Sequence, residues 1–184
     1  MFSSPMVALA AVVGSAVALP QLTSGTCTPE RRIAIAKQIP YAYSQDGVAA
    51  VYEAFHEIPF GVGDLDGPCV TEIYPNGGGP VVVGVTGQSV VNFGTATRQA
   101  FSFVTGRYVD FPHNGTTVIY TEVTLGVNSV VPIPTTFSGQ VFLDYTSDCR
   151  ITAVRAYAEV PTYILGQPTD IYKLLLIPKI PSII

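Results

Sequence analysis

The chain has 184 residues, of which only 12% are charged, and its formal net charge is −4. Its hydrophobic share of 48% excludes a disordered chain, because disorder needs low hydrophobicity and high charge. The nine basic residues do not cluster, so the sequence lacks the electrostatic footprint of a nucleic-acid-binding protein, and we exclude nucleic acid as a partner.

Residues 1–18, MFSSPMVALAAVVGSAVA, predict a cleaved secretory signal. This apolar stretch is too short to span a bilayer, and it ends in the small-x-small pattern that signal peptidase cleaves. No basic residue precedes it, which departs from the usual leader and leaves a membrane anchor as the alternative. We expect secretion, or residence in the lumen of the secretory pathway, with Leu19 as the first mature residue and no stable membrane anchor.

Two helices are predicted next. The first begins at Thr28, which can cap the helix ahead of a proline at the first helical position, and Pro40 ends or kinks it. The second covers residues 46–57, where apolar side chains recur at helical spacing, and Pro59 stops it.

From residue 70 onward the apolar period changes to two, and β-branched and aromatic residues dominate. Strands at 70–74 and 81–85 flank a Gly-rich turn, and residues 88–93 form a short helix. Longer strands are expected at 99–110, 116–126, 136–145 and 150–160, the last two forming an antiparallel hairpin.

This order of segments predicts one α+β domain over residues 19–160, in which a curved sheet wraps around the helices and leaves an internal pocket. Residues 161–184 form a Pro-rich apolar tail without a predicted place. Asn114 begins an Asn-Gly-Thr sequon in a turn signal, so we expect a glycosylated surface turn there.

The three cysteines all follow the leader, and in an oxidising compartment their odd count leaves one thiol unpaired. We favour a disulfide between Cys69 and Cys149, because each stands in a turn just before a predicted strand. With only two histidines and no zinc-ligand spacing, a metal site is not expected.

Three stretches resemble the NTF2-like or SnoaL-like superfamily, which includes ketosteroid isomerase, scytalone dehydratase and small polyketide cyclases. They are Arg32–Phe55 as paired helices, Thr71–Phe93 (TEIYPNGGGPVVVGVTGQSVVNF) as hairpin plus short helix, and the last hairpin, where Arg155, Tyr157 and Glu159 resemble the closing strand. The resemblance covers roughly residues 30–160. It implies an NTF2-like cone with a mixed, mostly antiparallel sheet.

A secreted, glycosylated chain of this kind is most similar to the ketosteroid isomerase-like dimerising cyclases of fungal maleidride and phomoidride pathways. That likeness implies the coupling of two maleic anhydride monomers, through a carbanion formed in the pocket and directed at its partner. It also implies a homodimer formed through the outer face of the sheet.

Familiar catalytic signatures are absent from the sequence: it has no Gly-x-Ser-x-Gly elbow, phosphate loop, dinucleotide fingerprint or His-Glu-x-x-His. We therefore expect acid–base or templating chemistry without a cofactor. His56 is a candidate base or proton shuttle, and the alternative is a histidine that interacts with the helix dipole. Asp64 and Asp66 lie near the position at which ketosteroid isomerase relatives carry an acidic base. The alternative is that they only form a turn, and Glu72 fits the family position equally well.

Strand alternation places Arg155 and Tyr157 on one face, which is either concave or convex. On the concave face Arg155 would hold a carboxylate or anhydride oxygen, with Tyr157 beside it, and Glu122 would likewise line the pocket. On the convex face they are ordinary surface residues.

The helix tyrosines Tyr41, Tyr43 and Tyr52 resemble, by segment, the enolate-stabilising tyrosine of ketosteroid isomerase. The alternative is that they line the core with their hydroxyls in water. Two functions stay open: a cofactor-free cyclase or isomerase of secondary metabolism, and a secreted non-catalytic protein that binds a hydrophobic small molecule. Charged groups converging on a closed pocket would favour the first, and an apolar cavity with those groups outside would favour the second.

Overall fold

A computed structural model describes residues 26–127, 131–164, 167–168 and 170. The predicted leader at residues 1–18 and the mature start at Leu19 lie outside this part of the chain, as does most of the tail at 161–184. Within the described ranges, no helix is long and apolar enough to cross a membrane.

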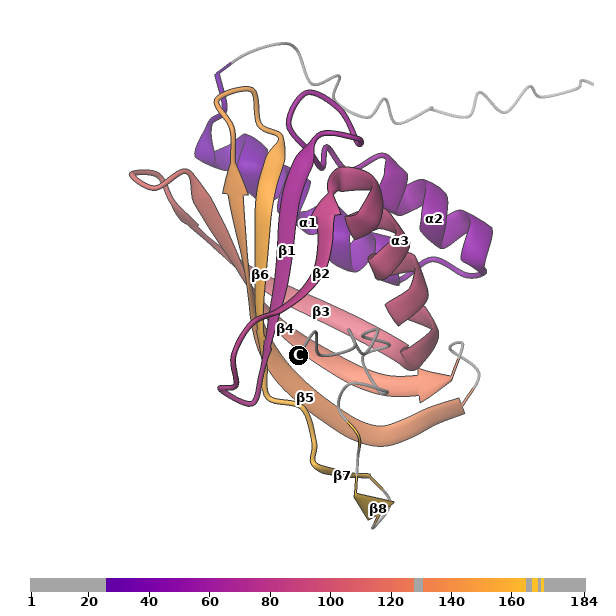
Figure 1. Cartoon of the computed structure of the whole chain (residues 1–184). Helices are drawn as coiled ribbons and strands as arrows, with labels where there is room; N and C mark the ends of the chain where they lie inside the picture. The colour runs from indigo at the N-terminus through magenta and orange to yellow at the C-terminus, as the bar shows by residue number, and fades with distance from the viewer. Residues whose placement is uncertain (1–25, 128–130, 165–166, 169, 171–184) are drawn as a thin grey trace, which may run out of the picture.

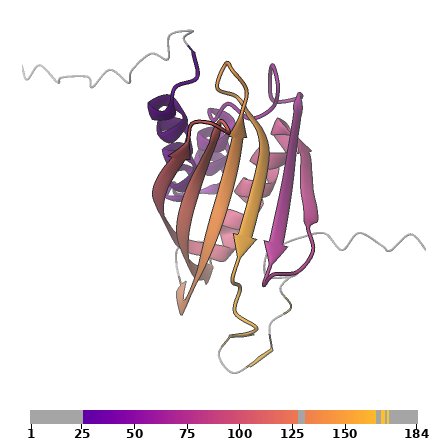
Figure 2. The same cartoon turned by 90° about the vertical axis from the view of Figure 1, so that its left-hand side faces the viewer.

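The described chain forms a six-stranded sheet whose concave face is covered by helices (Figure 1). The strand order is β2-β1-β6-β5-β4-β3, with β1 parallel to β6 and all other neighbours antiparallel. Figure 2 shows the sheet in front of the three helices, which all pack on its far side. The α+β cone expected from the sequence is thereby confirmed.

The order of the elements follows the sequence prediction, while α1, α3 and β5 are longer than predicted. The helices are α1 Pro29–Tyr43, α2 Val48–His56, α3 Gly87–Thr97 and the 3-10 turn η1 Arg98–Ala100. The sheet strands are β1 Pro68–Pro75, β2 Val81–Thr86, β3 Phe101–Phe111, β4 Thr116–Val127, β5 Val131–Tyr145 and β6 Ile151–Ala158. A separate small hairpin pairs β7 Tyr163–Ile164 with β8 Gln167–Pro168.

Helix α1 runs past Pro40 instead of ending there. Thr28 caps its start by accepting the Arg31 N–H at 3.3 Å, and the backbone N–H of Ser44 donates to the Pro40 carbonyl at 3.0 Å. A proline removes one helical hydrogen bond but does not prevent the next turn when that turn is packed. The extra turn carries Tyr43 over the sheet.

Helix α3 is longer than the predicted 88–93. It starts with a capping box in which the hydroxyl of Thr86 accepts the Ser89 N–H at 3.2 Å, while Ser89 Oγ accepts the Thr86 N–H at 2.9 Å. Glycine and threonine are weak helix formers, so the helix predicted from the sequence stops before Gly94. Burial of this last turn against α2 keeps it helical.

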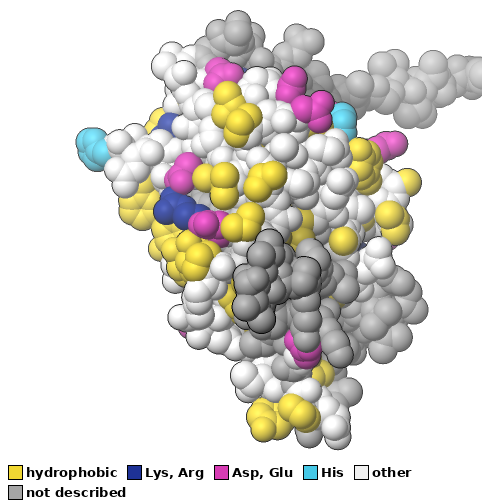
Figure 3. Space-filling model, viewed as in Figure 1, with side chains coloured by type: hydrophobic (Ala, Val, Ile, Leu, Met, Phe, Trp, Pro, Cys, Tyr) yellow, Lys and Arg dark blue, Asp and Glu magenta, His cyan; other side chains and the backbone are white. Residues whose placement is uncertain are grey.

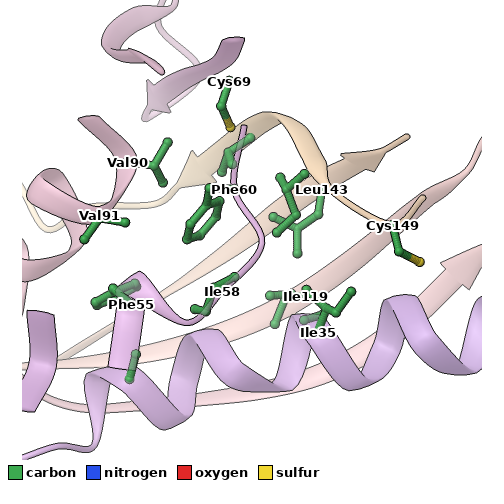
Figure 4. Packing of buried hydrophobic residues seen from close by; sticks show 14 of the residues in the cluster. Ile35, Phe55, Ile58, Phe60, Cys69, Val90, Val91, Ile119, Leu143 and Cys149 are labelled. Atoms are coloured by element: carbon green, nitrogen blue, oxygen red, sulfur yellow. The ribbon is translucent and has the colours of Figure 1, made fainter. Parts of the chain in front are cut away.

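The main core lies between the helices and the concave face of the sheet (Figure 4). Ile35 of α1, Phe55 of α2, Ile119 of β4 and Leu143 of β5 all belong to this cluster, and each is at most 2% exposed. Each such side chain contributes about 1.5–3 kcal/mol of apolar burial, which fixes the helices on the sheet.

The expected Cys69–Cys149 disulfide is wrong, because Cys149 pairs with Cys27. Cys69 lies inside β1 and not in a turn, and it is a fully buried thiol of the core. Cys149 does occupy the turn before β6, where the N–H of Cys27 donates to the Ser147 carbonyl at 3.2 Å. The bridge spans 122 residues, a length at which the chain-entropy model gives about 5 kcal/mol.

Asn114 lies in the turn between β3 and β4 and is exposed, as the sequon required. Its glycosylation stays a prediction.

Candidate functional site: an apolar cavity under the helices

A cavity of about 120 Å³ opens between the concave face of the sheet and the helices α1 and α3. The helices contribute Ile39, Pro40 and Tyr43 from α1, and Phe93 and Thr97 from α3. Apolar side chains of five strands line the rest, among them Ile73, Phe101, Val104, Val123, Phe137 and Ala156. Such a lining favours an apolar guest.

The polar groups of this cavity are hydroxyls. Tyr43 Oη lies 3.0 Å from Thr97 Oγ1, and the Tyr43 ring packs edge-on against Phe55 and tilted against Phe101. Burial raises the pKa of Tyr43 above its ordinary value, more than the Thr97 hydrogen bond and the charge of Arg98 lower it. Tyr43 is therefore a neutral hydroxyl at physiological pH. Thr121 of β4 adds a further hydroxyl to those of Tyr43 and Thr97.

Charged groups do not converge on the cavity. Among the described residues that line it there is no aspartate, glutamate, histidine or lysine. Arg98, which follows α3, is 7% exposed, and its Nη1 donates to the Phe101 carbonyl at 2.6 Å. The cavity thus provides shape and hydrogen bonds but no ionised acid or base from the part of the chain described.

His56 lies away from the cavity, at the exposed end of α2, with its ring 5.8 Å from that of Tyr52. It borders an open cleft of about 550 Å³ that also holds Asp64 and Asp66. Asp64 Oδ1 accepts hydrogen bonds from the backbone N–H groups of Asp66 and Gly67, each at 3.0 Å. Asp64 therefore stabilises a turn, which is the second of the two roles considered for it. No described group of histidine, cysteine and carboxylate side chains could hold a metal ion.

The concave placement of Arg155 is corrected by the strand register. Leu143 and Val154 are opposite each other and buried, so the next pair along the strands, Phe142 and Arg155, projects from the outer face. There Arg155 Nη2 donates to the Asp144 carboxylate at 2.7 and 2.8 Å, and its guanidinium lies over the Phe142 ring. Arg155 thus has a partner outside the pocket.

Glu72 and Tyr157 belong to the same outer face. Glu72 accepts a hydrogen bond from the Tyr74 hydroxyl at 2.8 Å, and the Tyr74 ring stacks on that of Tyr157 with centroids 4.5 Å apart. Tyr157 borders both the cavity and the outer side, but its stacked ring faces outward with Tyr74. These placements separate both residues from the Tyr43 hydroxyl.

An open groove of about 580 Å³ runs across this outer face. The exposed Glu122 lies in it, beside Gln140 and the aromatic pair of Tyr74 and Tyr157. Its far wall is Tyr120, whose ring is covered by the Arg107 guanidinium at 4.5 Å. The groove combines aromatic rings with charges of both signs.

Of the three helix tyrosines, only Tyr43 lines the cavity. Tyr41 is 61% exposed at the end of α1, and Tyr52 is 37% exposed and accepts a hydrogen bond from Gln88 at 3.2 Å. Thr97 and Arg98 are not among the residues predicted from the sequence. The available signal was weak, because both follow the glycine that appeared to end the third helix.

The curved sheet, the helices on its concave face and the apolar cavity between them make up an α+β domain of the cone type expected from the sequence. No protein-family model matches this chain, and no curated protein matches it in sequence.

Several solved structures have a similar backbone fold. A putative isomerase of the SnoaL-like family from Agrobacterium tumefaciens is 14% identical, with 70% of this chain and 97% of that chain covered and a TM-score of 0.43. SalBIII, an epoxide hydrolase/cyclase-like enzyme of pyran ring formation in salinomycin, is 13% identical over 73% and 95%, with a TM-score of 0.48. BvnE pinacolase from Penicillium brevicompactum is 13% identical over 79% and 90%, with a TM-score of 0.46. At these values the likeness concerns the fold and carries no activity over to this chain.

Proposed function

We propose that the protein is a cofactor-independent cyclase or isomerase that binds an apolar, oxygen-bearing small molecule in the cavity under α1 and α3. The supporting observation is that the apolar lining closes around one hydroxyl pair, Tyr43 and Thr97. Such a site accelerates a reaction by holding reacting atoms in a productive geometry and by directed hydrogen bonds. The described lining contains no ionised base, so the proposed catalysis does not use one.

The specific reaction proposed is the coupling of maleic anhydride monomers, which the sequence resemblance implies. A carbanion forms only when a base removes a C–H proton. The described lining supplies no such base, so in this proposal a base of the buffer takes the proton and the chain orients the monomers. A cavity of about 120 Å³ accommodates a single small ring, since a comparable engineered cavity holds benzene. Coupling of two monomers therefore requires the cavity to widen.

A non-catalytic carrier of a hydrophobic small molecule is the second candidate. The criterion set from the sequence favours it, because the described lining is apolar and the charged groups lie outside the cavity, and binding needs only shape and apolar area. The enzyme is supported by the Tyr43–Thr97 hydroxyl pair and by the sequence resemblance. The two candidates share the cavity and differ in turnover.

The test combines product analysis and binding on one sample. Purified protein is incubated with maleic anhydride monomers, dimeric products are sought by mass spectrometry, and binding is measured by calorimetry. We expect product from the wild type, a loss of at least tenfold in Tyr43→Phe, and no change in Tyr41→Phe, which alters an exposed tyrosine of the same helix. Binding without any product would select the carrier.

A cavity-filling pair tests the location of the site. Ala156→Leu places a larger side chain in the cavity, whereas Ala153→Leu makes the same change on the outer face of the same strand β6. Binding should fall at least tenfold in the first variant and stay unchanged in the second. Equal binding by both would place the site elsewhere and overturn the proposal.

The proposal includes export and self-association. Secretion is supported by the leader pattern and by the Cys27–Cys149 disulfide, which forms in oxidising compartments. A homodimer through the outer face of the sheet is supported by the family resemblance and by the aromatic groove on that face.

A further inference from the structure

The Thr97 hydroxyl sits among three oxygens that compete for its single proton. Thr97 Oγ1 lies 3.0 Å from the Phe93 carbonyl, 3.1 Å from the Gly94 carbonyl and 3.0 Å from Tyr43 Oη, in a side chain that is 2% exposed. A hydroxyl donates one proton and accepts through its lone pairs, whereas a carbonyl only accepts. Only two arrangements of the protons are consistent with these contacts.

In the first arrangement Tyr43 donates to Thr97, and Thr97 donates to the helix carbonyls, so both protons are used. In the second, Thr97 donates to Tyr43, and the Tyr43 proton then points into the apolar cavity. A buried donor without a partner is costly, while the carbonyls accept the Thr97 proton at good distances. The first arrangement is therefore the stable one for the cavity without a guest.

We infer that Tyr43 presents lone pairs to the cavity, and that the preferred guest is an apolar molecule carrying a hydroxyl group and not a carbonyl group. A guest hydroxyl donates to Tyr43 Oη without disturbing the bond to Thr97. A guest carbonyl meets lone pairs unless the Tyr43 proton turns away from Thr97. Thr121 does not discriminate, because its rotatable hydroxyl donates or accepts equally well.

Thr97 is then a specificity-determining residue that acts through Tyr43. The inference rests on the proposed function only as far as an apolar, oxygen-bearing guest in this cavity, because a preference for a hydroxyl group counts against maleic anhydride, which carries carbonyl groups and no hydroxyl. Tyr43 keeps its ring in place through the packing on Phe55 and Phe101, so removing the Thr97 oxygen changes the direction of the proton and not the shape of the site.

The test compares cyclohexanol with cyclohexanone, two rings of nearly equal size, titrated into the full chain and followed by NMR. We expect the wild type to bind cyclohexanol about fivefold more tightly, the effect of one hydrogen bond. Thr97→Val removes the acceptor, frees the Tyr43 proton and should reverse the preference. Tyr43→Phe should bring the affinity ratio close to one.

Thr95→Val is the matched control. Thr95 is a buried threonine of the same helix whose hydroxyl donates to the Val91 carbonyl at 2.8 Å, and it does not line the cavity. This variant should keep the wild-type preference.

A wild type that binds both compounds equally, or prefers the ketone, overturns the inference and leaves the proposed function standing. A wild type that binds neither overturns the proposed function and this inference with it. If Thr97→Val fails to fold, the wild-type ratio and its loss in Tyr43→Phe decide.

Discussion

Arg32 and Asp110 form the most buried ion pair among the described residues. Their side chains are 6% and 5% exposed, and Arg32 donates to both Asp110 oxygens at 2.8 and 2.6 Å. A third Arg32 N–H donates to the Cys27 carbonyl, and Thr117 donates to Asp110 at 2.7 Å. The ion pair therefore connects the start of α1 to β3 and β4. Because both side chains are hydrogen-bonded, neither buried charge lacks a partner.

Removal of the Asp110 charge should be strongly destabilising. Asp110→Asn leaves the Arg32 charge buried without a counter-charge, which costs about 3–5 kcal/mol of unfolding free energy. Asp144→Asn is the control, because its partner Arg155 has a side chain 37% exposed, and an exposed pair contributes about 1 kcal/mol or less. Urea denaturation measures both, and equal losses would contradict the account.

The same pair sets a pH dependence. Burial raises the pKa of Asp110, but the hydrogen bonds from Arg32 and Thr117 and the charge of Arg32 together outweigh burial and hold it below its usual value. The stabilisation is therefore complete above the unfolded-state pKa, near about 3.9, and is lost as the pH falls through the folded-state value. Acid titration should lower wild-type stability more steeply than that of Asp110→Asn. Parallel curves would show that Asp110 does not titrate as described.

At the residue scale the sequence predicted the chemistry of Tyr43 without distinguishing it from Tyr41 and Tyr52. Which of the three faces the cavity depends on the rotation and length of each helix, and α1 continues past Pro40 only because its last turn is packed. Thr97 acquires its role from a contact 54 residues away along the chain, which no local pattern contains.

Helices α2 and α3 approach closely at a glycine. A Cβ on Gly94 would lie 2.8 Å from two atoms of the Phe55 ring, and that ring packs against Tyr43. The glycine therefore sets the distance between the two helices and, through Phe55, the position of the cavity's tyrosine.

Gly94→Ala should destabilise the protein even though alanine is the better helix former by about 1 kcal/mol. The displaced Phe55 ring is 2% exposed and has little room, so overpacking costs about 1–3 kcal/mol. Thermal unfolding measures the loss. Gly79→Ala, where a Cβ meets no atom within 4 Å, should be nearly neutral, and a stabilised Gly94→Ala would refute the close-approach argument.

At the element scale the alternation of apolar residues predicted the strands and their order, but not which face of the last strand is concave. Period-two alternation is symmetric between the two faces. The pairing of Leu143 with Val154 under the helices decides it, and it places Arg155 outside. The choice between the two faces, which the sequence left open, thus depends on packing between elements and not on the strand assignment.

At the scale of the whole molecule, the Cys27–Cys149 disulfide joins the residues just before α1 to the turn between β5 and β6, and no local sequence pattern predicts that pairing. Three cysteines allow three pairings, and the choice depends on which turns the folded sheet brings together. The fold class, in contrast, follows from the order of helical and strand segments, which is a local property of the chain.

The outer face has the composition of a protein interface. Aromatic and arginine side chains, which interfaces favour, line its groove. Figure 3, which takes the view of Figure 1 and not the view onto this face, shows hydrophobic and charged side chains scattered over that side of the molecule. Arg107 and the acidic Glu122 share this groove. In a two-fold dimer the same patch meets itself, so the arginine of one copy can pair with the glutamate of the other.

Arg107→Glu should therefore dissociate the proposed homodimer, since it removes that pairing and sets like charges against each other across the two-fold axis. Lys37→Glu makes the same change of charge on α1, away from the outer face, and should leave the association intact. Light scattering after gel filtration gives the mass of each form. We expect twice the chain mass for the wild type and for Lys37→Glu, and the single-chain mass for Arg107→Glu. A monomeric wild type, or a dimeric Arg107→Glu, would show that the groove has another purpose.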